Sequence, residues 1–278
     1  MRLLPIHVSL LVLCLVGCGP KPEVCHDGQV PTPSRPLLPA ELPALALAHA
    51  HNDYEHPRPL HDALEAGFHS VEADVFYDGG RFKVSHLGWG SPGTLEALYL
   101  EPLQARVDAE GSIHAPGATF TLWIDLKDRH RDLVQDLNAL LAGYGMLRSS
   151  EAGPAPVRVI LTGDAEAKTA FVEETPDSPV WRDSNDFSLD DPPAGEGRWR
   201  AYALKWSNYL DWNGVGELPE EDRQRLYCLA TNAHEKGRVV RFYGAPDREE
   251  VWQAMLDAGV DFIHTDRLEA LSTFLQGR

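Results

Sequence analysis

The sequence predicts an α/β fold, a single (β/α)8 barrel of the TIM type with its active site at the carboxyl ends of the strands. Short β-like apolar runs alternate with helical stretches over most of the chain, and repeated βα units imply parallel strands. There are about eight such runs, which is the number that closes a TIM barrel. The chain has 278 residues, and barrel domains of about 250 residues are common.

The expected strands are short runs, many of them rich in β-branched and aromatic residues. They are Leu45–His51, Ser70–Tyr77, Phe82–His86, Phe120–Lys127, Val157–Thr162, Ala201–Trp206, Val239–Tyr243 and Asp261–Thr265. Helices are expected at Pro59–Ala66, Asp132–Leu141, Glu166–Glu173, Glu220–Glu235 and Glu249–Ala258. Several of these stretches end at a glycine, as helices often do: Gly67, Gly143, Gly237 and Gly259.

An open, doubly wound sheet is the structural alternative. No Gly-x-Gly-x-x-Gly or Gly-x-x-x-x-Gly-Lys loop follows an early strand, which argues against a dinucleotide-binding or P-loop fold. Residues 175–200 contain acidic residues, prolines and glycines with little periodicity. We expect a long loop there, and such loops in barrels often lie over the active-site mouth.

The first residues form a separate segment. Met1–Arg2 is basic, and Leu3–Gly17 is apolar but too short for a transmembrane helix, which needs about 20 residues. The end of this stretch, Leu15-Val-Gly-Cys18, resembles the lipobox of bacterial lipoproteins. We therefore expect residues 1–17 to be a lipoprotein-type signal peptide and Cys18 to carry lipid, so that the protein is exported and anchored to a bacterial cell-envelope membrane. An ordinary secretory signal or an uncleaved anchor is the alternative.

Residues 18–43 are expected to be a proline-rich tether. Prolines recur at positions 20, 22, 31, 33, 36, 39 and 43, and this composition favours extended backbone that buries no core. Residues 44–278 are then the barrel. Cys25 in the tether and Cys228 in the barrel form a disulfide in one interpretation and stay apart in the other, because the tether is flexible.

The acidic composition limits the partners. The net charge is −17, from 25 basic and 42 acidic side chains, and such a surface repels the phosphates of nucleic acid. We expect no nucleic-acid partner, and we expect a monomer. A phosphate-bearing substrate would need a cation to offset the negative field, and a bound metal would supply one.

Two of the expected strands carry carboxylates among apolar residues. Glu72 and Asp74 lie in one of them, and Asp125 lies two residues before Lys127 in the other. Strand side chains alternate faces, so Glu72 and Asp74 share a face, and burying two like charges is costly unless a cation neutralises them. Asp125 and Lys127 could simply pair, with Glu72 capping a barrel end. The combination with two histidines favours a metal site, and oxygen ligands suit Mg²⁺ or Ca²⁺.

The two histidines end strands close to these carboxylates. His51 ends the first expected strand, and His86 ends the one after Glu72 and Asp74. A lone strand-end histidine is more often structural, but two at the carboxyl ends of barrel strands fit the face where barrel enzymes hold their active sites. Histidine suits proton transfer near neutral pH. His49 shares a face with His51 and either supports it or points into the barrel.

The order His51-Asn52, Glu72-x-Asp74, His86, Asp125-x-Lys127 resembles the phospholipase C-like phosphodiesterase superfamily. That group includes phosphoinositide phospholipases C, glycerophosphodiester phosphodiesterases and sphingomyelinase D enzymes. Further segments resemble bacterial and fungal proteins related to altered inheritance of mitochondria protein 6, namely His49-Ala-His-Asn-Asp-Tyr54, Ser70-Val-Glu-Ala-Asp-Val75, Thr94-Leu-Glu-Ala-Leu-Tyr-Leu100 and Val240-Arg-Phe-Tyr-Gly-Ala-Pro-Asp247. The resemblance spans residues 49–271.

The resemblance implies roles for the matching residues. By position, the ligands of a divalent cation, Mg²⁺ or Ca²⁺, would be Asn52, Glu72, Asp74 and Asp125. His51 and His86 would be the paired acid–base catalysts, and Lys127 would contact the phosphate. The chain also departs from the glycerophosphodiesterases, which have His-Arg-Gly where this chain has His51-Asn-Asp53. The arginine that binds phosphate at that position is therefore absent.

We therefore expect a metal-dependent phosphoric diester hydrolase that acts on glycerophosphodiesters or phospholipid headgroups. Its partners would be a small-molecule or lipid phosphodiester and, through the lipid anchor, a membrane. The alternatives are a cyclising phosphodiester transferase of the sphingomyelinase D-like type and a non-catalytic envelope binding protein on the same barrel. Outside the motif, Arg241 either reaches the mouth or pairs with an acidic neighbour, and Asp266 is expected to cap the final helix.

Overall fold

The structure is a computed structural model that describes residues 20–37, 43–114, 118–150, 153–195 and 198–277. Its strands are β1 Ala48–Ala50, β2 Ser70–Asp78, β3 Arg81–Val84, β4 Gly93–Thr94, β5 Phe120–Leu126, β6 Val157–Gly163, β7 Trp181–Ser184, β8 Trp199–Lys205, β9 Val239–Tyr243 and β10 Ile263–Thr265. Its α-helices are α1 His61–Glu65, α2 Glu101–Glu110, α3 Leu133–Ala142, α4 Ala165–Glu174, α5 Trp206–Tyr209, α6 Glu220–Glu235, α7 Glu249–Ala258 and α8 Leu268–Gln276. Among the described residues, none of the helices combines the length and the apolar character needed to cross a membrane.

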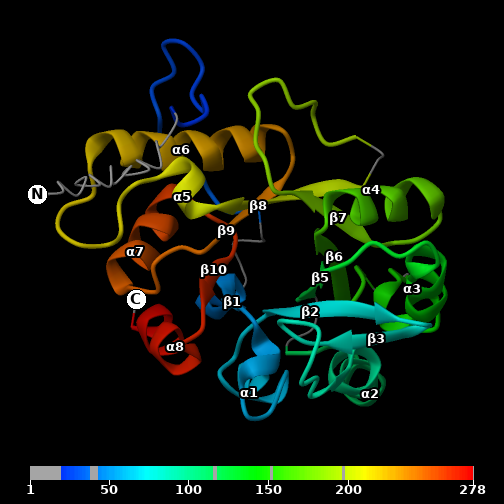
Figure 1. Cartoon of the computed structure of the whole chain (residues 1–278). Coiled ribbons are helices and arrows are strands. Elements are labelled where there is room, and N and C mark those ends of the chain that lie inside the picture. The colour runs from blue at the N-terminus through cyan, green and yellow to red at the C-terminus, as the bar shows by residue number, and fades with distance from the viewer. Residues whose placement is uncertain (1–19, 38–42, 115–117, 151–152, 196–197, 278) are drawn as a thin grey trace, which may run out of the picture.

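One large sheet organises the molecule, with helices around it (Figure 1). Its parallel strands follow the order β10-β1-β2-β5-β6-β7-β8-β9, and β3 and β4 extend it antiparallel beside β2. The two end strands approach each other, since an isolated parallel bridge joins Arg241 of β9 to Phe262, just before β10. The prediction of a mixed α/β fold built on parallel strands is confirmed.

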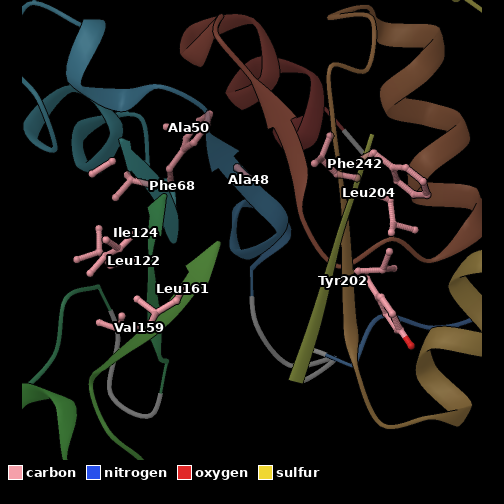
Figure 2. Packing of buried hydrophobic residues seen from close by; sticks show 14 of the residues in the cluster. Ala48, Ala50, Phe68, Leu122, Ile124, Val159, Leu161, Tyr202, Leu204 and Phe242 are labelled. Atoms are coloured by element: carbon pink, nitrogen blue, oxygen red, sulfur yellow. The ribbon is translucent and has the colours of Figure 1, made fainter. Parts of the chain in front are cut away.

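The strands divide their side chains between two layers. On β5, Leu122 and Ile124 are fully buried and belong to the main apolar core, which Figure 2 shows along several strands. Burying such a side chain stabilises the fold by about 1.5–3 kcal/mol. Trp123, between them, belongs to a second and smaller cluster on the inner side of the sheet, with Ile160, Ala201, Ala203, Val239 and Phe262. The alternation of the strand residues thus separates an outer core from an inner space.

The inner positions also hold buried polar residues. His49 is 0% exposed, Glu72 is 3% exposed and Arg241 is 1% exposed. His49 lies on β1, Glu72 on β2 and Arg241 on β9. The residues before and after each of them belong to the main apolar core, so these three side chains point to the other face of the sheet. The same periodicity that builds the core therefore gathers charge inside the sheet.

The expected set of parallel strands needs one correction. The run expected at 82–86 forms β3, which pairs antiparallel with β2, because the Gly79-Gly80 turn is too short for a parallel crossover. Both glycines have positive φ, 55° and 87°, as a tight hairpin turn requires. The missing parallel strand is β7, which lies inside the segment expected to be a loop. Its sequence is half charged, so hydrophobic pattern alone does not reveal it.

Residues 20–37 pack against the sheet domain and do not behave as the expected tether. We call this segment the strap. Val24 is 1% exposed within the main core, and Cys25 is disulfide-bonded to Cys228 of α6. Asn232 of α6 donates from Nδ2 to the carbonyl of Val24 at 2.7 Å. Proline content predicts extended backbone, but it does not show that the polar groups of that backbone find partners on a helix.

Candidate active site

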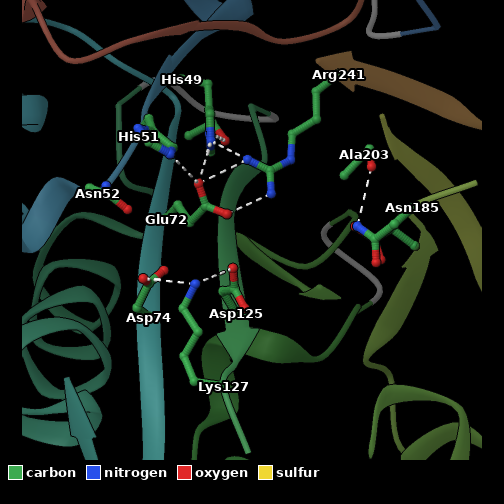
Figure 3. Close-up of polar contacts among 12 residues, drawn as sticks. His49, His51, Asn52, Glu72, Asp74, Asp125, Lys127, Asn185, Ala203 and Arg241 are labelled. Carbon is green, nitrogen blue, oxygen red and sulfur yellow. Dashed lines mark hydrogen bonds and ion pairs between the residues drawn. The ribbon is translucent and has the colours of Figure 1, made fainter. Parts of the chain in front are cut away.

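A cleft of about 410 Å³ opens at the carboxyl ends of the parallel strands. The side chains around it come from strands that are far apart in sequence, as Figure 3 shows. The residues that line it are His51, Asn52, Glu72, Asp74, His86, Asp125, Leu126, Lys127, Thr162, Gly163, Asp164, Asn185, Arg241 and Tyr243. The fold therefore brings together every catalytic and metal-ligating residue predicted from the sequence.

A larger cleft, of about 720 Å³, lies beside α1 and the start of α8. Three of its charged side chains pair with one another, since Arg58 lies 2.7 Å from Asp62 and 2.6 Å from Glu65. It offers no comparable cluster of histidines and carboxylates, so size alone does not identify the functional site.

Three carboxylates meet in the smaller cleft. One oxygen each from Glu72, Asp74 and Asp125 can be chosen so that all lie within 4.8 Å of one another. Oδ1 of Asp125 is buried without a hydrogen-bond partner among the described residues, and burial together with the charge of Glu72 raises the pKa of Asp125 to about 6. Unpaired acidic oxygens at this spacing fit a hard divalent cation.

Gly163, at the end of β6, makes room for this arrangement. A Cβ atom added there would lie 2.0 Å from Oδ1 of Asp125 and 2.5 Å from the carbonyl oxygen of Leu126. Its φ is +85°, a conformation that glycine adopts without strain. The approach of the neighbouring backbone to Asp125 therefore requires glycine at this position.

Arg241 holds Glu72 in its ionised form. Its Nη2 lies 2.6 Å from Oε1 of Glu72 and its Nη1 lies 3.0 Å from Oε2. Burial favours the neutral acid, but the charge of Arg241 and its two hydrogen bonds hold the pKa of Glu72 well below its ordinary value. Burial lowers the pKa of His49 to about 4, so its neutral Nε2 accepts a hydrogen bond from Arg241 at 2.9 Å. Of the two interpretations of Arg241, pairing with an acidic neighbour is the observed one.

Lys127 lies between the other two carboxylates. Its Nζ is 2.9 Å from Oδ2 of Asp74 and 2.8 Å from Oδ2 of Asp125. Burial opposes protonation, but the two carboxylates raise the pKa of Lys127. The pairing of Asp125 with Lys127, which the sequence left open, is present, yet it does not satisfy the second oxygen of Asp125.

His51 is oriented by the carboxylate of Asp266, which the sequence analysis expected to cap the final helix. Its Nδ1 lies 2.7 Å from Oδ1 of Asp266, and its Nε2 lies 4.0 Å from Glu72. Burial opposes protonation, but the hydrogen bond to Asp266 and the charge of Glu72 raise the pKa of His51. The expected capping role of Asp266 is wrong, because the N-cap of α8 is Arg267 and its side chain makes no capping hydrogen bond.

His86 follows β3 at the rim of the cleft, with its side chain 52% exposed. Its Nδ1 lies 3.2 Å from the hydroxyl of Tyr54 and 3.4 Å from Oδ2 of Asp74. The same hydroxyl donates to Oδ1 of Asn52 at 3.2 Å. Asn52 has φ +45°, which asparagine tolerates better than most residues. This turn after β1 places Asn52 beside the carboxylates.

The residues with contacts in the site that were not predicted as site residues include Asp266 and Asn185. Asp266 directly follows β10, and Asn185 directly follows β7. The rule that groups at the carboxyl ends of barrel strands face the mouth could have found Asp266. It could not have found Asn185, because β7 itself was not recognised.

Comparison with known proteins points to the same group of phosphodiesterases. Residues 43–177 match the family model of the AIM6-like phosphodiesterase domain. The chain is similar to altered inheritance of mitochondria protein 6 of Eremothecium gossypii, with 27% identity over 92% of this chain and 76% of that protein. It is also similar to the protein of the same name from Lachancea thermotolerans, with 26% identity over 81% of this chain and 64% of that protein.

A solved structure shares the fold. The crystal structure of glycerophosphodiester phosphodiesterase from Agrobacterium tumefaciens superposes with a TM-score of 0.52 and 16% identity, over 83% of this chain and 99% of that chain. At this identity the likeness concerns the fold alone. It agrees with the arrangement of parallel strands and helices described above.

The predicted location is wrong. The curated relatives, including a homologue from Arthroderma benhamiae that is 26% identical over 80% of this chain, are fungal proteins and not lipoproteins of a bacterial membrane. Residues 1–17 and Cys18, on which the prediction rested, lie outside the described residues. A four-residue lipobox pattern is short and can arise by chance at the end of an apolar stretch.

The motifs, the family match and the named relatives agree on one group. The resemblance inferred from His51-Asn52, Glu72-x-Asp74 and Asp125-x-Lys127 is confirmed. These findings support a place for the chain in the phospholipase C-like phosphodiesterase superfamily, near the altered inheritance of mitochondria protein 6 group.

Proposed function

We propose that the protein is a metal-dependent phosphoric diester hydrolase that uses paired histidines for acid–base catalysis. The observation that carries the proposal is the cluster of Glu72, Asp74 and Asp125 beside His51 and His86 in one cleft. The match to a phosphodiesterase domain supports the reaction class. Three clustered acidic side chains, two of them buried, would repel an anionic substrate, so the reaction needs a cation in the same place.

The chain's own residues fit a divalent cation. Asp74 and Asp125 would hold it with Asn52, and Glu72 would share its carboxylate between the cation and Arg241. When bound, Mg²⁺ or Ca²⁺ supplies positive charge that polarises a phosphoryl oxygen. The preference between the two ions depends on cavity size and ligand number.

The two histidines would then move the protons. His51, held through Nδ1 by Asp266, presents Nε2 to the cleft and would deprotonate the attacking water or hydroxyl. His86, at the rim, would protonate the leaving alkoxide. Lys127 would stabilise negative charge on the phosphoryl oxygens from its place between Asp74 and Asp125.

We also infer that the sheet closes into a (β/α)8 barrel through β9 and β10. Besides the bridge between Arg241 and Phe262, the amide of Asp261 donates to the carbonyl of Val240 at 3.1 Å. A closed barrel places the ends of all eight parallel strands around one mouth. This closure is what would bring Arg241 of the last strands against Glu72 of β2.

The proposed substrates are glycerophosphodiesters or phospholipid headgroups. The fold shared with a glycerophosphodiester phosphodiesterase supports the choice of compound class. The sequence His51-Asn-Asp53 in place of His-Arg-Gly indicates that the phosphate is bound differently here, through Lys127 and the cation.

The test is turnover of a panel of phosphodiesters by the purified chain. Activity should depend on Mg²⁺ or Ca²⁺ and should be lost with EDTA. His51→Ala and His86→Ala should each lower kcat by about 10²–10⁴-fold, the usual worth of acid–base catalysis. His61→Ala, at an exposed position of α1, is the matched control and should keep full activity.

Product analysis by ³¹P NMR distinguishes hydrolysis from cyclisation, because a cyclic phosphodiester product would appear in place of the phosphomonoester. Full activity in both histidine variants would disprove the catalytic roles. Full activity in EDTA would disprove the metal dependence. A purified chain that binds the panel but turns over none of it would favour a binding protein.

A further inference from the structure

A buried ion pair lies behind the wall of the cleft, and the proposed reaction does not use it. Lys168 of α4 is 2% exposed and Asp183 of β7 is 0% exposed, with 2.5 Å between Nζ and Oδ1. A buried pair of this kind costs desolvation energy and is weak evidence for stability by itself. Nζ of Lys168 also donates to Oδ1 of Asn185 at 2.5 Å. The pair therefore has a third member, which lies at the surface of the cleft.

The orientation of the Asn185 amide is fixed by its partners. Lysine can only donate, so the atom beside Nζ of Lys168 is the oxygen. The carbonyl oxygen of Ala203 can only accept, and it lies 3.2 Å from Nδ2 of Asn185. Both ends of the amide are thus assigned by the hydrogen-bond network. Nδ2 has a second hydrogen, for which no described residue provides an acceptor.

The amide faces the same cleft as the proposed catalytic groups. Asn185 lines the cleft, and Figure 3 shows it across the carboxylates from His51 and Asn52. Arg241, which also lines the cleft, is already bound to Glu72. The second N–H of Asn185 has no acceptor among the described residues and can donate to a ligand on the side of the cleft opposite the histidines.

We propose that Asn185 is a substrate-binding residue whose Nδ2 donates a hydrogen bond to an oxygen of the phosphodiester, and that Lys168 is a positioning residue that fixes this amide. The proposal rests on the proposed function. The acceptor oxygen belongs either to the phosphoryl group or to a hydroxyl of the esterified alcohol. Both are oxygen acceptors on the same molecule, and two substrates distinguish them.

The experiment compares methyl 4-nitrophenyl phosphate with glyceryl 4-nitrophenyl phosphate, which share a leaving group and differ in hydroxyls. Asn185→Ala should lower kcat/KM about tenfold, the worth of one hydrogen bond. A loss with both substrates identifies the phosphoryl oxygen, and a loss with the glyceryl ester alone identifies the hydroxyl. Asn138→Ala, on the outer helix α3, is the matched control. Unchanged kinetics of Asn185→Ala with both substrates would overturn the proposal.

The role of Lys168 needs a variant that leaves no unpaired buried charge. Lys168→Met combined with Asp183→Asn removes both charges together. It should reproduce the substrate pattern of Asn185→Ala, and adding Asn185→Ala to it should cause no further loss, because the three residues act as a unit. A further loss of about tenfold on adding Asn185→Ala would show that Lys168 does not act through Asn185.

A chain that lacks the proposed hydrolase activity is distinguished from one in which Asn185 has no role by measuring binding instead of turnover. If the wild-type chain turns over neither ester, calorimetry measures the binding of both esters in Ca²⁺. About tenfold weaker binding by Asn185→Ala then supports the role of Asn185 in a protein that does not catalyse. Equal affinity of the two proteins, or no binding by either, overturns it.

Discussion

Two carboxylates at opposite ends of the sheet, those of Asp261 and Asp125, have different surroundings. Asp261, just before β10, is 0% exposed and each of its oxygens has protein partners. The amide of Leu37 in the strap lies 2.6 Å from Oδ1, and Nε2 of His234 and the amide of Val240 each lie 2.8 Å from Oδ2. Asp125, at the carboxyl end of β5, has one oxygen on Lys127 and the other without a partner among the described residues.

The difference shows which end of the molecule is built for a ligand. A buried carboxylate whose hydrogen-bonding capacity is filled by the protein contributes to stability, and nothing further is needed to explain it. A carboxylate with a buried, unfilled oxygen and a raised pKa is costly unless something else binds there. Burial alone does not separate the two roles, but the count of satisfied oxygens does.

The largest predicted effect compares these two residues directly. Asp125→Asn should lower activity by about 10²–10⁴-fold, because a bound metal supplies several kcal/mol of charge stabilisation, and it should abolish the binding of Ca²⁺ seen by calorimetry. Asp261→Asn should retain kcat and bind Ca²⁺ normally. It should lower the free energy of unfolding by about 1–3 kcal/mol, since its amide places an N–H against backbone donors.

The comparison fails if the two variants exchange their effects. Loss of Ca²⁺ binding in Asp261→Asn, at temperatures where circular dichroism shows it folded, would mean that the amino end also holds a cation. Full activity in Asp125→Asn would mean that Lys127 and Arg241 neutralise the site without a metal.

The next effect concerns the strap. The disulfide between Cys25 and Cys228 joins residues 203 positions apart, so it restricts the unfolded chain. The double variant Cys25→Ser/Cys228→Ser should lose about 2–4 kcal/mol of unfolding free energy and keep its kcat, because the strap packs on α6, away from the cleft. Urea denaturation of the oxidised and reduced wild-type chain provides the control. An unchanged midpoint after reduction would show that the strap does not stabilise the fold.

A smaller effect is expected at Asp266. Asp266→Asn removes the carboxylate that holds His51 through Nδ1. Activity should fall about 10–100-fold, since hydrogen bonds to charged groups are worth about 1.5–3 kcal/mol. Glu269→Gln, in the first turn of α8, is a matched loss of one negative charge and should have no effect on kcat. Equal kcat in Asp266→Asn and Glu269→Gln would assign His51 a role that does not depend on its orientation.

The alternation of apolar and polar residues was sufficient to predict much of the site from sequence. Glu72 and Asp74 share a face whatever the details of the barrel, so their convergence follows from the strand alone. Arg241 and Asp266 depend on how the last strands return to the first, which is a property of the whole sheet. Sequence reasoning could name these residues but could not choose between their possible partners.

The fold was predictable where apolar pattern and turn chemistry agree, and not elsewhere. β7 was not recognised because its buried Asp183 is neutralised by Lys168, a contact between segments that periodicity does not show. The strap was not recognised because several of its contacts are hydrogen bonds between its backbone and distant side chains, together with one disulfide. Both cases involve polar groups whose partners lie elsewhere in the chain.

The smallest predicted effect concerns His69, which directly precedes β2 and lies at the same end of the sheet as Asp261. His69 is 5% exposed and stacks on His114 with 4.2 Å between ring centroids, and burial with the neighbouring His114 lowers the pKa of His69 to about 4. The unfolded chain binds a proton near pH 6.5, so the stability contributed by neutral His69 is present above that pH and is lost as the pH falls towards 4.

His69→Gln should therefore flatten the dependence of unfolding free energy on pH between 7 and 5, by at most about one bound proton. Urea denaturation at several pH values measures this slope. His61→Gln, at an exposed site, should leave the slope as in the wild type. Part of the slope should remain in His69→Gln, because burial also lowers the pKa of His49 to about 4 and that of His264 to about 3. A slope unchanged from wild type would mean that His69 binds its proton equally well in the folded and the unfolded chain, so that burial does not lower its pKa.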